Sequence, residues 1–289
     1  MELLSGSTLF KNPAIPLAVA AYNQEDRRFH THDFSELVLI VSGSGLHLFE
    51  GKAYPIRAGD LLVIPQGRVH GYTQPEELRL INVCFRESAL PTVEGLVDSP
   101  LYAAIFKVSP FLRREASESA RFTPEPSSFG RMVRVVEEME AELSESSQER
   151  LWMAQSLLLR LVVLVLRSTS EGASREGVDY RSSRAYRLGS LVSSLEARPD
   201  VSVDVGEMAR RSHVSESTLF RSFHRAFGTT PIRYRDRIRM ERAAELLLST
   251  ARPVVDIALE LGFSDGNYFS RRFKTIRGIS PGAFRRGTR

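Results

Sequence analysis

Three histidines and one glutamate near the start of the chain have types and spacing suited to binding a ligand. His30, His32 and Glu36 fall within seven residues, and His70 follows a run of apolar residues that ends at Pro65. Strand alternation would point His30 and His32 to one face. Imidazoles and a carboxylate can hold Fe, Mn, Ni or Zn, or they can hydrogen-bond a small polar molecule. A purely structural role is the third interpretation.

These side chains fall in a segment, residues 29–86, that predicts short strands. Its apolar runs lie between Gly- and Pro-containing turns, at 37–41, 46–49, 61–64 and 78–85. Ser42-Gly-Ser-Gly45 is expected to be a turn between the first two runs. Such spacing predicts a small β-barrel or sandwich. In a barrel, His70 would return across from His30 and His32, and the four polar residues would surround one cavity.

Two helices are expected after the barrel. Residues 128–143 have apolar side chains at helical spacing, and 148–167 are more apolar still. The most apolar run, 151–166, has 16 residues and includes Arg160, which falls short of the roughly 20 that cross a bilayer. We therefore expect a buried helical hairpin whose remaining apolar face forms a dimer, and no membrane contact.

Composition divides the chain into an acidic and a basic part. The 289 residues carry a net charge of +4. Residues 183–289 hold 20 Lys and Arg against 11 Asp and Glu, a net charge of +9, so the remainder carries −5. A basic module suggests a polyanion as partner. Cys84 is the single cysteine, which excludes a disulfide framework and a Cys-rich zinc module. A lone thiol and an N-terminus without signal-peptide features favour the cytoplasm.

The basic part repeats itself at an offset of 49 to 50 residues. The matched pairs are Ala209 and Ala258, Val214 and Phe263, Arg221 and Arg271, Phe223 and Phe273, Gly228 and Gly278, Pro231 and Pro281, Tyr234 and Phe284, and Arg235 and Arg285. Asp204 and Ser215 are expected to cap the two helices of copy one, and Ser264 or Asp265 the second helix of copy two. His213 and Gly262 occupy the tight turns.

This pattern predicts two helix-turn-helix units, at 204–227 and 254–277, joined by a connecting helix at 237–248. Copy two and its surroundings resemble the AraC/XylS family of bacterial transcription regulators. The matching residues are Ile257-Ala258, Gly262-Phe263-Ser264-Asp265, Tyr268-Phe269, Arg271, Phe273-Lys274, Gly278, Ser280-Pro281 and Phe284-Arg285. The resemblance implies that both units enter successive major grooves on one face of double-stranded DNA.

The same resemblance implies which side chains contact DNA. Carried over by position, the candidates that face bases are Ser217, Phe220, Arg221, Gly266, Asn267, Ser270 and Arg271. Arg272 and Lys274 complete the set. Arg272 is expected to strengthen binding to all DNA sequences alike. Phe220 and Gly266 have no side-chain hydrogen-bond donor for a base, whereas Asn267 and Arg271 suit adenine and guanine edges.

The front domain carries a second resemblance. His30-x-His32-x-x-x-Glu36 and Pro65-x-Gly67-x-x-His70 are similar to both halves of the cupin motif, with Gln74 where the last Asn usually stands. Further residues resemble the sensor domain of the L-rhamnose-responsive activators within the AraC/XylS family. They are His32-Asp-Phe-Ser-Glu-Leu-Val38, Gly43-Ser-Gly-Leu-His47, Tyr54-x-Ile56, Gly59-Asp60 and Asn82-Val83. This resemblance implies a sugar as effector.

The expected fold is a β + α multidomain chain, with a cupin-like jelly-roll barrel followed by helices. Its parts are the barrel (1–100), a helical dimerisation region (101–168), a linker rich in Ser, Gly and charge (169–183), and an all-α DNA-binding domain (184–289). The expected function is a ligand-responsive, sequence-specific regulator, an activator of sugar-catabolic genes. It would act as a homodimer with RNA polymerase as a further partner.

Two other functions fit the same residues. The first is a metal-dependent cupin enzyme with a DNA-binding tail, and the second is a constitutive DNA-binding protein with a vestigial sensor. The regulator interpretation expects no catalytic residue, because His30, His32, Glu36 and His70 would bind the effector. It also expects no cofactor, with a divalent metal held by the same four residues as the alternative.

Overall fold

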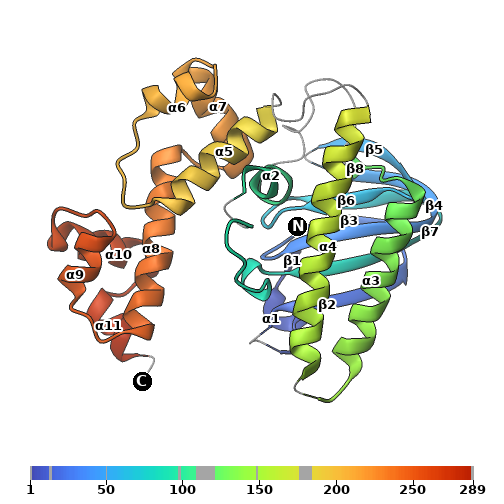
Figure 1. Cartoon of the computed structure of the whole chain (residues 1–289), viewed down its shortest axis with the longest axis horizontal. Helices are drawn as coiled ribbons and strands as arrows, with labels where there is room; N and C mark the ends of the chain where they lie inside the picture. Colours follow the sequence, from blue (N-terminus) through green and yellow to red (C-terminus); the bar gives the residue numbers. More distant parts are fainter. Residues whose placement is uncertain are drawn as a thin grey trace. The chain divides into compact units, whose positions relative to one another are not determined.

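The computed structural model describes residues 2–12, 15–49, 51–96, 99–108, 121–147, 149–175 and 184–287. The chain divides into two compact units, Met1–Gly189 and Ser190–Arg289. The first unit is built on a β-sheet and carries a helical hairpin, whereas the second is all-α (Figure 1). This arrangement confirms the predicted fold class.

Within the residues that the structure describes, the first unit is built on one sheet of eight strands. Its strands are β1 (Glu2–Leu4), β2 (Leu17–Asn23), β3 (Arg27–His32), β4 (Ser35–Phe49), β5 (Lys52–Arg57), β6 (Leu61–Ile64), β7 (His70–Phe85) and β8 (Arg121–Phe122). They lie in the order β1-β3-β7-β4-β6-β8, while β2 also pairs with β7 and β5 with β4. β1 pairs with β3 in parallel, and the other strand pairs within the described residues are antiparallel.

The turn predicted at Ser42–Gly45 is wrong, because residues 35–49 form one continuous strand. The register of β4 against β7 shifts at three places between Ile40 and Leu46. Gly43 has a φ of +75°, and a Cβ built there would lie 2.2 Å from the carbonyl oxygen of Glu77. Only glycine fits such a close approach at positive φ, so this segment is a bulge that bends both strands together.

Both faces of the sheet are buried in its central part, at residues 36–40 of β4, 61–64 of β6 and 80–85 of β7, which explains the continuous apolar runs there. Alternate side chains point to opposite faces. One set forms an inner core of Val38, Ile40, Phe49, Ile56, Leu62, Ile64, Tyr72, Leu78 and Leu80. The other set, which includes Leu37, Leu39, Val63 and Val83, packs against helices. Residues from both halves of the bent strands therefore meet in one interior.

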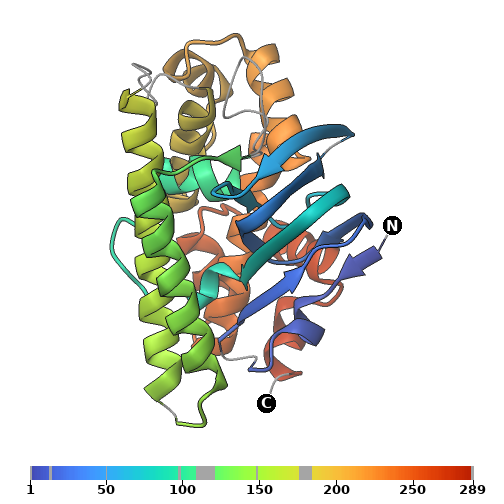
Figure 2. The same cartoon turned by 90° about the vertical axis from the view of Figure 1, so that its right-hand side faces the viewer.

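Two long helices, α3 (Pro126–Ser144) and α4 (Glu149–Arg175), lie side by side along one face of the sheet (Figures 1 and 2). Met132 and Val136 of α3 and Leu161 and Val165 of α4 are fully buried in the same core as the outward-facing strand residues. They correspond to the expected helical hairpin. The shorter elements of this unit are α1 (Gly6–Leu9), η1 (Glu87–Ala89), α2 (Pro100–Tyr102) and η2 (Ala103–Lys107).

The linker predicted over 169–183 is wrong at its start, because α4 continues to Arg175. The hydroxyl groups of Thr169 and Ser170 donate to the carbonyl oxygens of Val165 and Leu166, one turn earlier in the helix. These two hydrogen bonds give the hydroxyl groups partners within the helix, although the composition of the segment had predicted a loop. Residues 176–183 of the predicted linker lie outside the described residues.

Within α4, the stretch Glu149–Glu171 is long and apolar enough to cross a membrane by length and composition alone. It has 23 residues and is therefore longer than the 16-residue run considered in the sequence. One of its faces packs in the core shared with α3 and the sheet, through Leu158, Leu161, Val162 and Val165. A third of its most apolar window is buried in this way, so other faces of the helix stay exposed.

The second unit contains the tandem helices expected from the repeat. The boundary between the two units falls within α5 (Arg184–Ala197). The helices that follow are α6 (Val205–Arg211), α7 (Glu216–Phe227), α8 (Pro231–Ser249), α9 (Val254–Glu260), α10 (Gly266–Arg277) and α11 (Pro281–Arg286). The connecting helix α8 begins six residues before the predicted start at 237. Thr230 caps its first turn and Pro231 occupies its first position, as Ser280 and Pro281 do for α11.

The repeat is visible in the hydrogen bonds of the turns. The backbone N–H of Val214 donates to the carbonyl oxygen of Ala209, and Phe263 donates to Ala258 in the same way. His213 and Gly262, one residue before these donors, both have positive φ, at 54° and 76°. The α6–α7 and α9–α10 turns therefore have the same bond in the same place.

Candidate ligand site and nucleic-acid interface

The structure brings the four polar residues predicted as a ligand site together inside the sheet. His30, His32, Glu36 and His70 are each at most 5% exposed. The rings of His30 and His70 have centroids 4.1 Å apart, and those of His32 and His70 are 5.2 Å apart. Strand pairing produces this closeness, since His30 of β3 lies opposite His70 of β7.

Glu36 stands between two of the imidazoles. Its Oε2 lies 3.5 Å from the Nε2 of His32 and 3.5 Å from the Nε2 of His70. Its Oε1 accepts a short hydrogen bond from the Nδ2 of Asn82, whose amide also reaches the hydroxyl of Tyr22 at 2.5 Å. The carboxylate is therefore held through one oxygen, and its other oxygen faces the histidines.

His47, Tyr72 and Asn82 belong to the same site, although the predicted residue set did not include them. His47 of β4 is fully buried, and its ring centroid lies 5.7 Å from that of His70 and 5.2 Å from that of Tyr72. In the pairing of β4 with β7, His47 lies directly opposite Tyr72. We call His30, His32, Glu36, His47, His70, Tyr72 and Asn82 the histidine cluster.

The bulges in β4 explain why His47 was missed. Glu36, Val38 and Ile40 point inward at even positions, whereas His47 and Phe49 point inward at odd ones. Strict alternation from Glu36 would place His47 on the opposite face. The signal that could have found it is the Gly43 and Gly45 pair in an apolar strand, which is typical of a bulge.

Gln74, where the cupin motif usually has its last Asn, does not join the cluster. Its side chain is exposed, its φ is +52°, and its backbone N–H donates to the carboxylate of Asp26 at 2.8 Å. Gln74 therefore shapes a bend of β7, and Asn82 is the amide that contacts Glu36.

Many polar atoms of the histidine cluster are buried without a hydrogen-bond partner. They are His32 Nε2, Glu36 Oε2, both ring nitrogens of His47 and of His70, the hydroxyl oxygen of Tyr72, and Asn82 Oδ1. A buried polar group without a partner costs about 1–3 kcal/mol. Such a concentration of unsatisfied polar groups in one place is unusual for a protein interior and calls for an explanation.

Burial keeps the imidazoles of His47 and His70 neutral. Burial, together with the neighbouring His30, lowers the pKa of His47 to about 3. Burial and the neighbouring histidines also lower the pKa of His70 well below its usual range. Burial raises the pKa of Tyr72, and nearby Glu36 adds to that effect. Neutral imidazole offers one donor and one acceptor, and the phenol offers both roles, so the cluster can bind groups that donate and accept.

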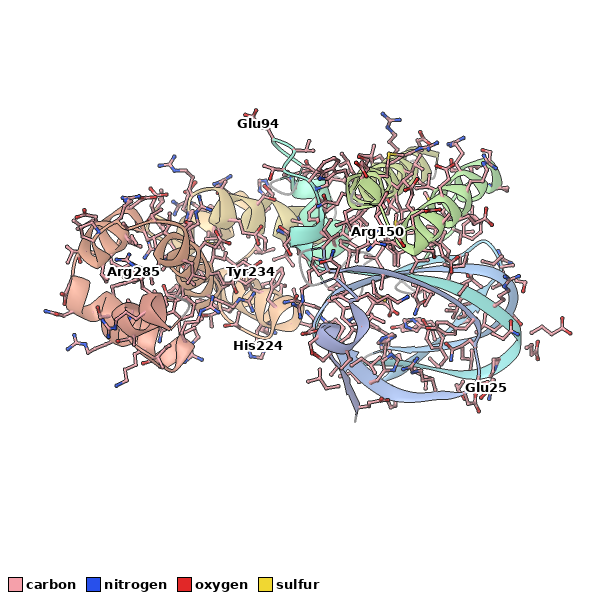
Figure 3. All side chains as sticks on the ribbon, turned by 90° about the horizontal axis from the view of Figure 1, so that it is seen from below. Glu25, Glu94, Arg150, His224, Tyr234 and Arg285 are labelled. Carbon is pink, nitrogen blue, oxygen red and sulfur yellow. The ribbon has the colours of Figure 1, made fainter. Side chains whose placement is uncertain are left out.

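The second candidate site consists of exposed stripes on α7 and α10, one in each helix-turn-helix. On α7, Ser217, Arg221 and His224 are exposed at positions i, i+4 and i+7, which share one helix face. Figure 3 shows His224 at the edge of its unit, whereas the labels of Tyr234, which is buried, and Arg285, which is half-buried, fall within its outline. His224 was absent from the predicted set, although the 50-residue offset pairs it with Lys274.

On α10, Asn267, Arg271 and Lys274 are exposed at the equivalent positions. Fully buried Phe269 and Phe273 anchor the same helix in the core. The exposed stripe therefore carries an amide, a guanidinium and an ammonium group, which can bind base edges and phosphates.

The other predicted DNA-binding residues are less exposed to solvent. Phe220, Gly266 and Ser270 are half-buried, and Gly266 is the first residue of α10. Arg272 does not belong to the exposed stripe, because its guanidinium lies 3.2 Å from the carboxylate of Asp236 on α8. That ion pair gives Arg272 a structural partner within the protein.

Comparisons with known proteins identify two families in this chain. Residues 12–161 match the AraC-like ligand binding domain family, and residues 208–287 match a helix-turn-helix domain family. The HTH-type transcriptional activator RhaR of Mannheimia succiniciproducens is 25% identical over 283 residues, which cover 98% of this chain and 96% of that protein. The HTH-type transcriptional activator RhaS of Klebsiella pneumoniae is 29% identical over 261 residues, covering 89% and 87%.

Among solved structures, the C-terminal domain of AraT, a response regulator from Geobacillus stearothermophilus, is 34% identical. It covers 36% of this chain and 85% of that chain, with a TM-score of 0.34. The ligand-binding family alone matches more than half of the sequence, and the helix-turn-helix match follows it in the same chain. The chain therefore belongs to the AraC family of ligand-responsive, DNA-binding transcription regulators.

Proposed function

We propose that the chain is a transcription activator whose histidine cluster binds a sugar. The observation that carries this proposal is the set of buried nitrogen and oxygen atoms without partners in the cluster. Each sugar hydroxyl both donates and accepts a hydrogen bond, as neutral imidazole and phenol groups do. Both curated relatives described above are named transcriptional activators, which supports activation, with RNA polymerase as a partner.

The sugar would act by shifting a population of conformations. A ligand changes the equilibrium between two states only by its difference in affinity for them. Binding in the cluster would therefore favour the arrangement of DNA-binding units that matches the operator. The chain would act in the bacterial cytoplasm, where its operator is, and as a regulator rather than an enzyme.

A thermal-shift screen of sugars on the full-length protein tests this proposal, with L-rhamnose as the first compound. A ligand that binds only the folded state raises the melting temperature by mass action. The active sugar should then change the affinity of the protein for promoter DNA in a gel-shift titration. A cluster that binds none of the sugars, with unchanged DNA affinity, would contradict the proposal.

The helical hairpin is the proposed dimer surface. Trp152 and Met153 of α4 are 61% and 49% exposed, and Leu159 and Val163 follow on the same helix as half-buried residues. Exposed apolar side chains that gather on one face are typical of an interface. We expect a dimer by light scattering at micromolar concentration, and the Trp152→Glu variant should be a monomer. A wild-type monomer, with and without effector, would refute this surface.

A further inference from the structure

We propose that His32, Glu36 and His70 bind a divalent transition-metal ion, and that the ion keeps coordination positions open for an oxygen of the effector. The inference rests on the proposed function, because it adds the ion to the same sugar site. Within the described residues, these three form the one group of His, Cys, Asp or Glu whose donor atoms could hold a metal, all lying within 4.8 Å of one another.

The spacing of the donor atoms fits a coordination shell better than a hydrogen-bond network. Glu36 Oε2 lies 3.5 Å from both His32 Nε2 and His70 Nε2, and none of these three atoms has a hydrogen-bond partner. Zinc–nitrogen bonds of about 2.1 Å in a tetrahedral site place neighbouring ligand atoms about 3.4 Å apart. Direct hydrogen bonds would instead bring such atoms to about 2.7–3.2 Å.

The groups behind the donors orient them as metal ligands require. The Nδ1 of His32 lies 2.7 Å from the carbonyl oxygen of Phe34. A carbonyl only accepts, so Nδ1 carries a proton, and Nε2, which faces Glu36, is the ring nitrogen that would bind the ion. Asn82 holds Glu36 through Oε1 and leaves Oε2 for an ion. Backbone or amide partners of this kind fix the ring and the carboxylate at metal sites.

The donor set also decides which ion and which ligand would fit. Two imidazoles and one carboxylate suit Zn²⁺ and Fe²⁺, and they leave further positions open. A buried carboxylate oxygen without a partner is costly unless a cation or a donor meets it. His47 and Tyr72 line the same cluster, and their polar atoms could hydrogen-bond a hydroxyl group that binds the ion. The effector class is therefore a polyol with neighbouring hydroxyl groups.

Metal binding can be measured without any effector. Full-length protein, dialysed against a chelator, is titrated with Zn²⁺ and with Co²⁺, and bound metal is counted by atomic emission after equilibrium dialysis. We expect one ion per chain and a visible Co²⁺ absorption spectrum. Glu36→Gln, which is almost isosteric, and His70→Ala should each weaken binding about 100-fold or more.

His47→Leu is the matched control, because His47 is equally buried but is not one of the three ligands. It should bind the ion within about threefold of wild type. Less than one ion per chain, or binding that Glu36→Gln leaves unchanged, would overturn the metal site. If chelated wild-type protein still responds to the sugar while His70→Ala does not, the proposed function stands and the metal proposal fails. If metal binds as expected but no sugar does, the proposed function fails alone.

Discussion

Buried nitrogen-bearing side chains differ in their hydrogen bonding between the two units, as Arg239 and the histidine cluster show. In the helical unit, the guanidinium of buried Arg239 donates to the carbonyl oxygens of Pro199 and Asp200 and lies 5.0 Å from the centre of the Phe263 ring. In the sheet unit, His47 and His70 are as deeply buried and their ring nitrogens have no partner. Arg239 therefore helps to hold its own unit together, whereas the ring nitrogens of His47 and His70 are atoms that the proposed ligand would bind.

The architecture of the helical unit depends on one connecting helix. Asp236 of α8 binds Arg272 of α10, and Arg239, one turn later, binds the segment before α6. Arg235 and Arg285 repeat a related bond, to the carbonyl oxygens of Val201 and Arg252. Because α8 contacts elements of both helix-turn-helix units, it fixes the spacing between them.

The largest expected effect comes from Gly262→Ala, which tests this close packing. A Cβ at Gly262 would lie 2.2 Å from the carbonyl oxygen of Asp200 and 2.8 Å from the Arg239 guanidinium, at a φ of +76°. Clash and backbone strain together should cost on the order of 3–5 kcal/mol of unfolding free energy, with loss of DNA binding. Urea denaturation of the full-length protein measures this loss.

Gly228→Ala is the control for Gly262→Ala. Its φ is +67°, but a Cβ there would meet nothing within 4 Å. Only the backbone strain of about 1–2 kcal/mol should remain. Equal losses for the two variants would mean that the contact of Gly262 with Asp200 does not hold the unit together.

A smaller effect separates two neighbouring arginines. Arg271→Ala should lower operator affinity by about 1–3 kcal/mol and relax preference at one base pair, because Arg271 is exposed on the stripe of α10. Arg272→Ala should instead lower unfolding free energy by about 1 kcal/mol, since it removes the partly exposed ion pair with Asp236. Binding to a set of operator variants, beside urea melts, distinguishes the two. Uniform weakening of all operators by both variants would refute the assignment of Arg271.

The smallest effect has the opposite sign. His47→Leu removes two buried ring nitrogens that have no partner. If the sheet interior is incomplete without its ligand, the variant should be more stable than wild type by about 1 kcal/mol in the absence of effector. Thermal unfolding without any sugar tests this expectation. A loss of stability instead would show that His47 is part of the architecture, and the contrast between the two interiors would disappear.

The sequence was enough to predict features that depend on local chemistry. Asp204, Ser215 and Asp265 cap the helices as expected, and His213 and Gly262 take up positive φ in the two turns. The helices of the repeat could be recognised because each copy supports the other.

Features that depend on contacts between residues far apart in the sequence were harder to predict. His47 joins the cluster only because bulges in β4 shift the alternation, and the residues that accommodate Gly43 lie in β7. Arg272 is bound by Asp236, 36 positions earlier, so its spacing on α10 could not reveal its partner. A predicted pattern states which face a side chain takes relative to its neighbours, but not which groups meet it there.

The most direct test of the account is a transcription reporter on a promoter that the protein binds, with the sugar identified by thermal shift. Wild-type protein should respond to that sugar. His70→Ala and Glu36→Ala should lose the response completely and still occupy the operator in a footprint, because the two residues lie in the sheet unit and the exposed stripes lie in the helical unit. A normal response from both variants would contradict the claim that the histidine cluster binds the effector.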